Sequence, residues 1–209
     1  MIFLAIRGVI GAVILALAAL AALHVLRPDI HPGRTMISQY AVGRHGWLMF
    51  VCFGGLAVAS LCLALVLSPR LPSFLGRVGL VFLVAAGIGL GVAALCPMDP
   101  IAEGPRRFSL RGKLHGLGFL AGTPCMLLAV LLLSLSAGFH PARILLAAFA
   151  AMTWLSFGVV IWIMALVGPG KAPDPNGPER FLGAPNRLFM VGFGLWLLTA
   201  AWPLLPASL

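Results

Sequence analysis

Long apolar stretches alternate with short polar segments along almost the whole chain. A helix needs roughly 20 mainly apolar residues to cross the hydrocarbon core of a bilayer, and six stretches meet that length. Their approximate ranges are 4–26, 46–68, 76–97, 114–137, 143–167 and 186–206. The pattern predicts an all-α, polytopic membrane protein in which residues 1–209 form a single bundle of six transmembrane helices. An even number of spans would place both termini on the same side of the membrane.

The first apolar stretch has a second interpretation, as a signal peptide. Ala16-Leu17-Ala18 resembles a cleavage site, and Arg7 is the only charged residue that precedes it. The apolar run after Arg7 is longer than the usual apolar region of a signal peptide. We therefore expect a retained transmembrane helix.

Small residues are closely spaced in the third and fourth predicted helices. Gly89 lies in the third, and Gly118 and Gly122 lie in the fourth. In lipid, such residues let helix backbones approach closely, because packing replaces the hydrophobic effect between helices. Pro124 lacks an N–H and predicts a kink in the fourth helix, where Thr123 is placed to hydrogen-bond the freed carbonyl.

The reactive side chains gather in the first, third and fifth loops. All five acidic residues of the chain lie there, namely Asp29, Asp99, Glu103, Asp174 and Glu179. Most of the histidines lie in or beside the same loops. Because alternate loops of a helical membrane protein share one side of the bilayer, the sequence predicts a polar site at one membrane face.

Composition restricts the class of protein and its partners. Hydrophobic residues make up 61% of the chain, charged residues only 9%, and the mean hydropathy is +1.09, which excludes an ordinary soluble domain. The net charge of +9 comes from basic residues at helix ends and in short loops. Anionic lipid headgroups attract residues in those positions. The expected partners are therefore membrane lipids and not nucleic acid, and the oligomeric state is left open.

Charge does not decide the orientation of the bundle. Ten basic residues lie in the odd-numbered loops, against four in the N-terminus and the even-numbered loops. The positive-inside rule then places the odd loops in the cytoplasm. Arginines that belong to a functional site would bias this count, so both orientations stay open.

Asp99 and His115 are the main candidates for chemistry. Asp99 directly follows the Gly-rich third helix, where a carboxylate needs a partner because desolvation penalises its charged form. His115 opens the fourth predicted helix, and Gly116 and Gly118 leave room beside its ring. An aspartate that orients a histidine is a common arrangement for general acid–base catalysis.

This pairing predicts that the Asp99 and His115 side chains lie within hydrogen-bonding distance, directly or through one water. The alternative is that Asp99 only caps a turn or pairs with a loop arginine. His115 would then be an amphipathic packing residue at the membrane interface.

Ser38 and Tyr40 lie just before the second predicted helix, which His45 opens beside Arg44. Ser38 is the third catalytic candidate, and Tyr40 is the only tyrosine of the chain. The alternative is that Ser38 caps the helix and Tyr40 is an interfacial aromatic residue.

The sequence identifies no cofactor. No helix contains an HxxxH or HExxH pair, and the four cysteines form no CxxC pair. The cysteines are expected to be small packing residues. Metal or haem binding by the histidines is therefore the less favoured interpretation, and no metal ligand is assigned.

Basic residues of the odd loops form a second candidate surface. Arg106, Arg107 and Arg111 form a dense run in loop three, and such a run ordinarily contacts lipid phosphates. With residues of loops one and five, the run could instead grip one anionic headgroup, because guanidinium groups bind such oxygens bidentately. The ligand-binding candidates are Tyr40, Arg44, His45, Arg106, Arg107, Arg111, Glu179, Arg180, Asn186 and Arg187.

Several of these motifs resemble those of prokaryotic membrane proteins grouped as domain of unknown function 998. The motifs are Ile37-Ser38-Gln39-Tyr40, Pro97-Met98-Asp99-Pro100, Leu114-His115-Gly116-Leu117-Gly118 and Glu179-Arg180. The resemblance spans almost the whole chain and implies a six-helix protein of a prokaryotic cell (inner) membrane. It also implies that one face carries Ser38, Asp99, His115 and Arg180.

The chain departs from this family at two points. Cys96 stands where the family usually has an aromatic residue, and loop three is arginine-rich where the family's is more often glycine-rich. The family's usual basic even loops imply that the odd loops lie outside, against the positive-inside count. The resemblance supplies no reaction.

Three classes of function remain. The first is an intramembrane enzyme that acts on a lipid or hydrophobic small molecule through Asp99 and His115. The second is a binding or transport protein for an anionic lipid or amphiphile, and the third is an accessory or structural membrane protein. A channel or proton-coupled transporter is less favoured, because the helix interiors contain almost no ionisable groups.

Overall fold

The computed structural model describes residues 2–100, 108–136, 141–167 and 177–205, and this part of the chain contains no β-strand. Six long helices form the body of the protein: α1 (Ile2–Leu26), α2 (Trp47–Leu67), α3 (Phe74–Leu95), α4 (Leu110–Ser136), α5 (Arg143–Val167) and α6 (Gly183–Ala201). Short 3-10 turns accompany them: η1 (Ile37–Ala41), η2 (Ser68–Arg70), η3 (Pro178–Phe181) and η4 (Trp202–Leu204).

Each of the long helices is long and apolar enough to cross a membrane. The predicted all-α architecture with six transmembrane helices is therefore confirmed, and the protein is a multi-pass membrane protein. The helix boundaries differ in detail from the prediction. Helix α4 begins at Leu110 and not at residue 114, and α6 ends at Ala201 and not at residue 206.

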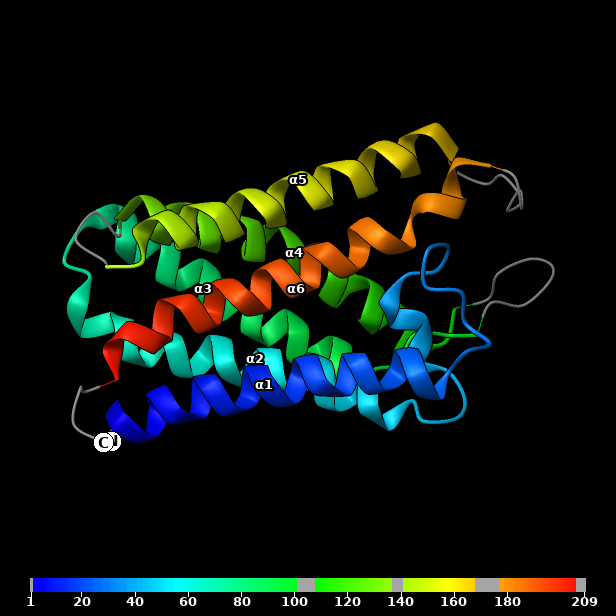
Figure 1. Cartoon of the computed structure of the whole chain (residues 1–209), viewed down its shortest axis with the longest axis horizontal. Coiled ribbons are helices and arrows are strands. Elements are labelled where there is room, and N and C mark those ends of the chain that lie inside the picture. The colour runs from blue at the N-terminus through cyan, green and yellow to red at the C-terminus, as the bar shows by residue number, and fades with distance from the viewer. Residues whose placement is uncertain (1, 101–107, 137–140, 168–176, 206–209) are drawn as a thin grey trace.

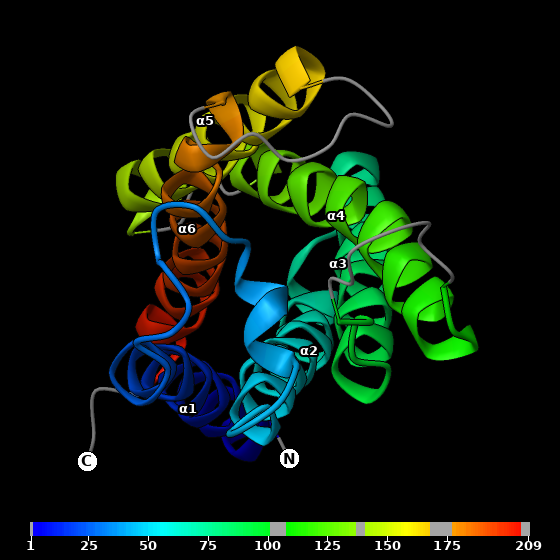
Figure 2. The same cartoon turned by 90° about the vertical axis from the view of Figure 1, so that its right-hand side faces the viewer.

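The helices run lengthwise beside one another, and consecutive helices are antiparallel (Figure 1). The closest pairs are α3 with α4, α1 with α2, α2 with α3, and α5 with α6. Helix α5 is the outermost, since only 28% of its span is buried. Its contacts with α4 are few. Seen from the end where the odd-numbered loops lie, α4 and α5 diverge from each other (Figure 2).

The described parts of the odd-numbered loops lie at one end of the bundle, at the right of Figure 1. Residues 27–46 join α1 to α2, and η1 packs there against α2 and α6. The last residues of α3, the first of α4 and the first of α6 reach the same end. The expected gathering of these loops on one face is therefore confirmed for the part of the chain that is described.

Small residues let α3 and α4 touch through their backbones. A Cβ atom added to Gly89 would lie 2.7 Å from the Gly122 Cα atom and 3.0 Å from the Gly118 carbonyl oxygen. Any side chain at Gly89 would have to push the helices apart. The predicted close approach of these two helices is confirmed.

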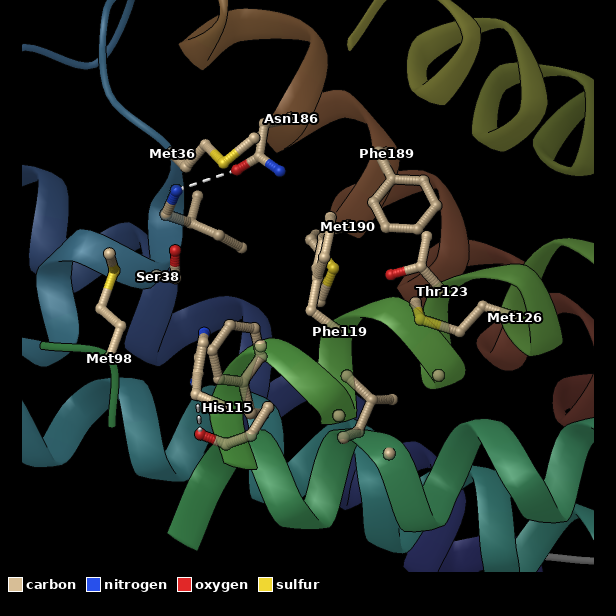
Figure 3. Close-up of a pocket in the computed structure, with 18 of the residues that line it drawn as sticks. Met36, Ser38, Met98, His115, Phe119, Thr123, Met126, Asn186, Phe189 and Met190 are labelled. Carbon is tan, nitrogen blue, oxygen red and sulfur yellow. Dashed lines mark hydrogen bonds between the residues drawn. The ribbon is translucent and has the colours of Figure 1, made fainter. Parts of the chain in front are cut away.

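Helix α4 continues through Pro124. Thr123 does not hydrogen-bond the carbonyl that proline leaves free, so that expectation is wrong. Instead its hydroxyl points into a cavity between α3, α4 and α6 (Figure 3). The Thr123 side chain thus faces the space beside α4 and not the backbone of its own helix.

Candidate functional site

A cavity of about 270 Å³ lies between η1, α2, α3, α4 and α6, near the odd-loop end. We call it the His115 cavity. Its walls are mostly sulfur-containing and aromatic side chains, among them Met36, Met98, Met126, Met190, Phe119 and Phe189. Methionine adapts to irregular apolar shapes because its side chain is unbranched and flexible. The volume is near the lower end of the range for small-molecule sites.

The cavity is open at one side, between α4 and α5. Gly116 on α4 and Met164 on α5 both line it, and both are exposed, Met164 to 46%. This is where α4 and α5 diverge (Figure 2). From these two exposed lining residues we infer an opening between α4 and α5, on a side of the bundle.

His115 enters the cavity from the second turn of α4. Its side chain is held by two backbone carbonyls at the end of α3, because Nδ1 lies 2.9 Å from the Cys96 oxygen and 3.3 Å from the Ala93 oxygen. Carbonyl oxygens only accept, so Nδ1 carries the proton and donates. His115 is 8% exposed, and its Nε2 atom has no hydrogen-bond partner among the described residues. In the tautomer that these bonds select, Nε2 carries a lone pair and faces the cavity.

Asn186 enters the cavity from the first turns of α6. Its Oδ1 atom accepts a hydrogen bond of 2.9 Å from the backbone N–H of Ile37 in η1. That bond fixes the orientation of the amide, and the Nδ2 group is directed into the cavity (Figure 3). Asn186 is only 5% exposed, and Nδ2 donates to no described residue. No sealed side-chain nitrogen or oxygen in the described part of the chain lacks a partner, so Nδ2 is a donor that is reached from the cavity.

Two hydroxyl groups complete the polar part of the lining. Ser38 lies on η1, on the side of the cavity that the His115 ring faces, and Thr123 lies deeper along α4 (Figure 3). Neither hydroxyl hydrogen-bonds to another described residue. The described lining contains no arginine, lysine, aspartate or glutamate. The site is therefore apolar and uncharged, with its polar atoms concentrated near the odd-loop end.

Asp99 lies outside this cavity and does not hydrogen-bond to His115. Its Oδ2 atom accepts from the Ser109 N–H at 2.8 Å, and its Oδ1 atom accepts from the Ser109 hydroxyl at 2.6 Å. The Ser109 hydroxyl in turn accepts from the Gly112 N–H at 3.0 Å. No direct hydrogen bond therefore joins Asp99 to His115, and the contact through one water stays a prediction.

Asp99 instead holds the start of α4, which explains why this helix begins earlier than predicted. The first N–H groups of a helix have no partner within the helix, and a carboxylate or hydroxyl near them satisfies them. The hydrogen bonds from Ser109 lower the pKa of the Asp99 carboxyl below its ordinary value. A Cβ atom at Gly112 would collide with Asp99 Oδ2, so this packing requires glycine there.

Arg187 is fully engaged inside the protein. Its Nε atom donates to His24 Nε2 at 2.6 Å, and Nη1 donates to the carbonyls of Thr35 and Gly183 at 2.7 and 3.0 Å. Its Nη2 atom donates to the Tyr40 hydroxyl at 3.1 Å. The guanidinium group thus joins α1, loop one and α6. Tyr40 is fully buried beside it.

The remaining predicted binding residues that the structure describes do not line the cavity. Arg44, Arg111 and Arg180 are exposed, and Arg180 lies 4.5 Å from the centre of the Phe181 ring. His45 is half-buried with a φ of +64°, a conformation that side chains rarely adopt. Glu179 is half-buried, and Arg106 and Arg107 lie outside the described residues.

Arg27 shapes loop one and was not a predicted site residue. It forms a salt bridge of 2.7 Å with Asp29, and its Nη1 atom donates to the carbonyls of Val42 and Arg44 at 2.8 and 2.9 Å. The hydrogen bonds from Arg27 lower the pKa of the Asp29 carboxyl. The loop is therefore braced before it reaches η1, where Ser38 lies.

Sequence reasoning identified His115, Ser38 and Asn186 but missed Phe119, Thr123 and Met126. A signal for these was present. Side chains three or four residues apart lie on the same face of a helix, so the stripe 115, 119, 123 and 126 forms one continuous face of α4. No group of three or more metal-ligating side chains is brought together in the described part of the chain.

Comparisons with known proteins locate the chain only at the level of a family. Neither the curated proteins nor the solved structures gave a match. The model of one family, described as a protein of unknown function (DUF998), matches residues 9–203. That range covers most of α1, all of the other five long helices and every residue of the His115 cavity. The protein is thus a six-helix membrane protein that belongs to the DUF998 family, as its sequence motifs predicted.

Proposed function

We propose that the protein binds a small hydrophobic molecule, or the polar end of one lipid, in the His115 cavity. One observation carries this proposal. His115 and Asn186 are each more than nine-tenths buried, yet each directs an unpartnered polar atom into the same apolar space. Both atoms are reached from the cavity, since no sealed side-chain nitrogen or oxygen among the described residues lacks a partner. A purely apolar occupant would leave them without hydrogen bonds, at a cost of about 1–3 kcal/mol for each group. A ligand that satisfies both atoms removes that cost.

The apolar walls hold the ligand without selecting it. A molecule dissolved in the bilayer already contacts lipid tails, which are as apolar as leucine, so it gains little by moving to another apolar surface. Shape and hydrogen bonds must then distinguish the ligand from bulk lipid. Within the described lining, those bonds can come from His115, Asn186, Ser38 and Thr123.

The opening between α4 and α5 supports entry from the membrane. A cavity of about 270 Å³ is too small for a whole lipid, but it can hold a polar end and the first part of a chain. The rest of the chain would leave past Gly116 and Met164, which are exposed at the opening. A long-chain molecule need not leave the bilayer to bind.

Blocking the opening tests this function. A Cβ atom at Gly116 meets no atom within 4 Å, so Gly116→Phe adds a ring at the cavity mouth without disturbing the helix backbone. Gly158→Phe on α5 is the matched control, because Gly158 has the same free space and does not line the His115 cavity. Each protein is purified in detergent, and its bound hydrophobic molecules are identified by native mass spectrometry and solvent extraction.

We expect Gly116→Phe to lose a bound molecule that both the unaltered protein and Gly158→Phe retain. The loss should be at least about tenfold, because the added ring occupies the space of the ligand. Equal retention by all three proteins, or no bound molecule in any of them, would contradict the proposal.

An enzyme that acts on the bound molecule is a second candidate, with His115 as general base. It is favoured by one observation, the two carbonyl bonds that hold the Nδ1 proton and leave the Nε2 lone pair facing the cavity. Ser38 lies on the same side of the cavity and is the candidate nucleophile or substrate-positioning group. Asp99 would act on this site only indirectly, through the start of α4.

The binding protein and the enzyme predict different bound molecules in a His115 variant. If His115 performs a reaction, His115→Gln should accumulate a molecule whose mass differs from that bound to the unaltered protein. If the protein only binds, the same molecule should be recovered at a lower amount. Extraction and mass spectrometry of both preparations decide between these results.

A further inference from the structure

We infer that the His115 cavity recognises a neutral hydrophobic alcohol, a long-chain molecule whose polar end is a hydroxyl group. This inference rests on the proposed function and adds the chemical class of the ligand. It follows from the fixed hydrogen-bonding roles of two buried side chains that point into one space.

His115 can offer only an acceptor. Its Nδ1 proton is used by the carbonyls of Cys96 and Ala93, so the second nitrogen of the neutral ring has a lone pair and no hydrogen. A protonated ring would place a positive charge in this space. No carboxylate among the described lining residues would balance that charge. The ligand must therefore bring a donor, an O–H or N–H group.

The unpartnered group of Asn186 is a donor. Its Oδ1 atom is used by the Ile37 N–H, so the group that remains is the Nδ2 amide. The ligand must therefore also bring an acceptor oxygen or nitrogen. Both side chains lie near the odd-loop end of the cavity, with the Ser38 hydroxyl between η1 and His115 (Figure 3).

A hydroxyl group carries both a donor and an acceptor. Its hydrogen donates to His115 Nε2, and its oxygen lone pairs accept from Asn186 Nδ2 or from Ser38. An ether or a fully esterified lipid lacks the donor. A carboxylate also lacks it, and a carboxylate or phosphate would be buried without a cation, since the described lining contains no arginine or lysine. A quaternary ammonium group lacks both donor and acceptor.

The test compares probes that share one chain and differ in the polar end. Tetradecanol, tetradecyl methyl ether, tetradecanoate and tetradecyltrimethylammonium are each titrated into the purified full-length protein at neutral pH, and the bound fraction is measured by native mass spectrometry. We expect tetradecanol to bind roughly five- to a hundredfold more tightly than each of the others, the ratio for leaving one buried group unsatisfied. This comparison needs no altered protein.

Two variants assign the preference to named atoms. His115→Leu should remove the difference between the alcohol and the ether, because leucine accepts no hydrogen bond. Asn186→Asp keeps an acceptor for the Ile37 N–H but offers the ligand no donor, so alcohol binding should fall by a similar ratio. Lys113→Gln, exposed on the same helix, is the control and should leave all four probes unchanged.

The outcomes separate this inference from the function on which it rests. Equal binding of alcohol and ether, or tighter binding of the carboxylate, together with loss of all binding in Gly116→Phe, would overturn the alcohol assignment and leave the proposed function intact. Binding of none of the probes, or binding that Gly116→Phe does not weaken, would overturn both.

Discussion

At the residue scale, Asp99 and His115 have separate partners although both lie where α3 meets α4. The carboxylate binds the Ser109 N–H and hydroxyl, and the imidazole binds the carbonyls that end α3. Backbone groups at helix ends lack partners within the helix, so nearby polar side chains bind them first. Both carboxylate oxygens of Asp99 are bonded in this way, whereas the Nε2 atom of His115 is available to a ligand.

The hydrogen bonds to Asp99 predict a pH dependence. They lower its pKa from the ordinary 3.8, so they stabilise the folded protein above about pH 4, and this contribution is lost as the pH falls through the lowered value. Asp99→Asn should be less stable than the unaltered protein at neutral pH, and the difference should shrink as the pH falls below 4. Thermal unfolding in detergent measures both proteins across that range.

A difference that stays constant down to the lowest pH would show that the charge of Asp99 does not support α4. Asp29→Asn is a useful comparison, since Arg27 lowers the pKa of that carboxyl as well. Its effect belongs to loop one and should not alter binding in the His115 cavity.

At the scale of the elements, the contact between α3 and α4 positions the cavity. Gly89 and Gly122 bring the two backbones together. The end of α3 then supplies the carbonyls that hold the His115 ring. Helix α5 makes few contacts with α4, which leaves the opening beside Gly116. The tight contact of α3 with α4 therefore forms one side of the cavity, and the loose contact of α4 with α5 leaves its opening.

Adding a side chain at the tight contact should separate the helices. Gly89→Val places a Cβ atom 2.7 Å from Gly122 Cα, and overpacking of this kind costs about 1–3 kcal/mol. Gly91→Val is the control, because the nearest atom to its Cβ is the Ala57 methyl at 4.0 Å. We expect a lower melting temperature and weaker ligand retention for Gly89→Val only. Similar behaviour of the two variants would show that the contact is not tight in the membrane protein.

At the scale of the whole molecule, Arg187 connects segments that are far apart in the chain. It joins His24 on α1, Thr35 and Tyr40 in loop one, and Gly183 on α6. Loop one carries η1, and η1 carries Ser38 and the N–H that orients Asn186. The lining of the cavity thus depends on a guanidinium group outside it.

Replacing this arginine should loosen the odd-loop end without changing the net charge. Arg187→Lys has fewer donors and no planar fork, so some of His24, Thr35 and Tyr40 lose their partner at a cost of about 1–3 kcal/mol. Hydrogen exchange at residues 27–46 should become faster. Arg180→Lys, exposed on Phe181, is the matched control and should exchange like the unaltered protein. Unchanged exchange in Arg187→Lys would mean that loop one is held by other contacts, such as those of Arg27.

Hydropathy alone determined the all-α architecture and the six membrane spans, because the hydrocarbon core requires long apolar segments whose backbone is satisfied internally. The alternation of loops then placed the polar residues at one end. Local motifs also identified the family and His115, Ser38 and Asn186 as site candidates. Each of these features depends on a single continuous segment of the sequence and not on contacts between segments.

The tertiary structure decided which polar residues share a site. Sixteen positions separate Asp99 from His115 in the chain. Only the packing of α3 on α4 showed that Asp99 binds the start of α4, whereas His115 lines the cavity. The charge of Arg187 and its place at a helix start are typical of a residue that binds lipid headgroups. Its side chain instead binds protein groups, because α1, loop one and α6 meet around it. Hydrogen-bond partners depend on distances between segments remote in sequence, and the spacing of residues along one chain does not contain those distances.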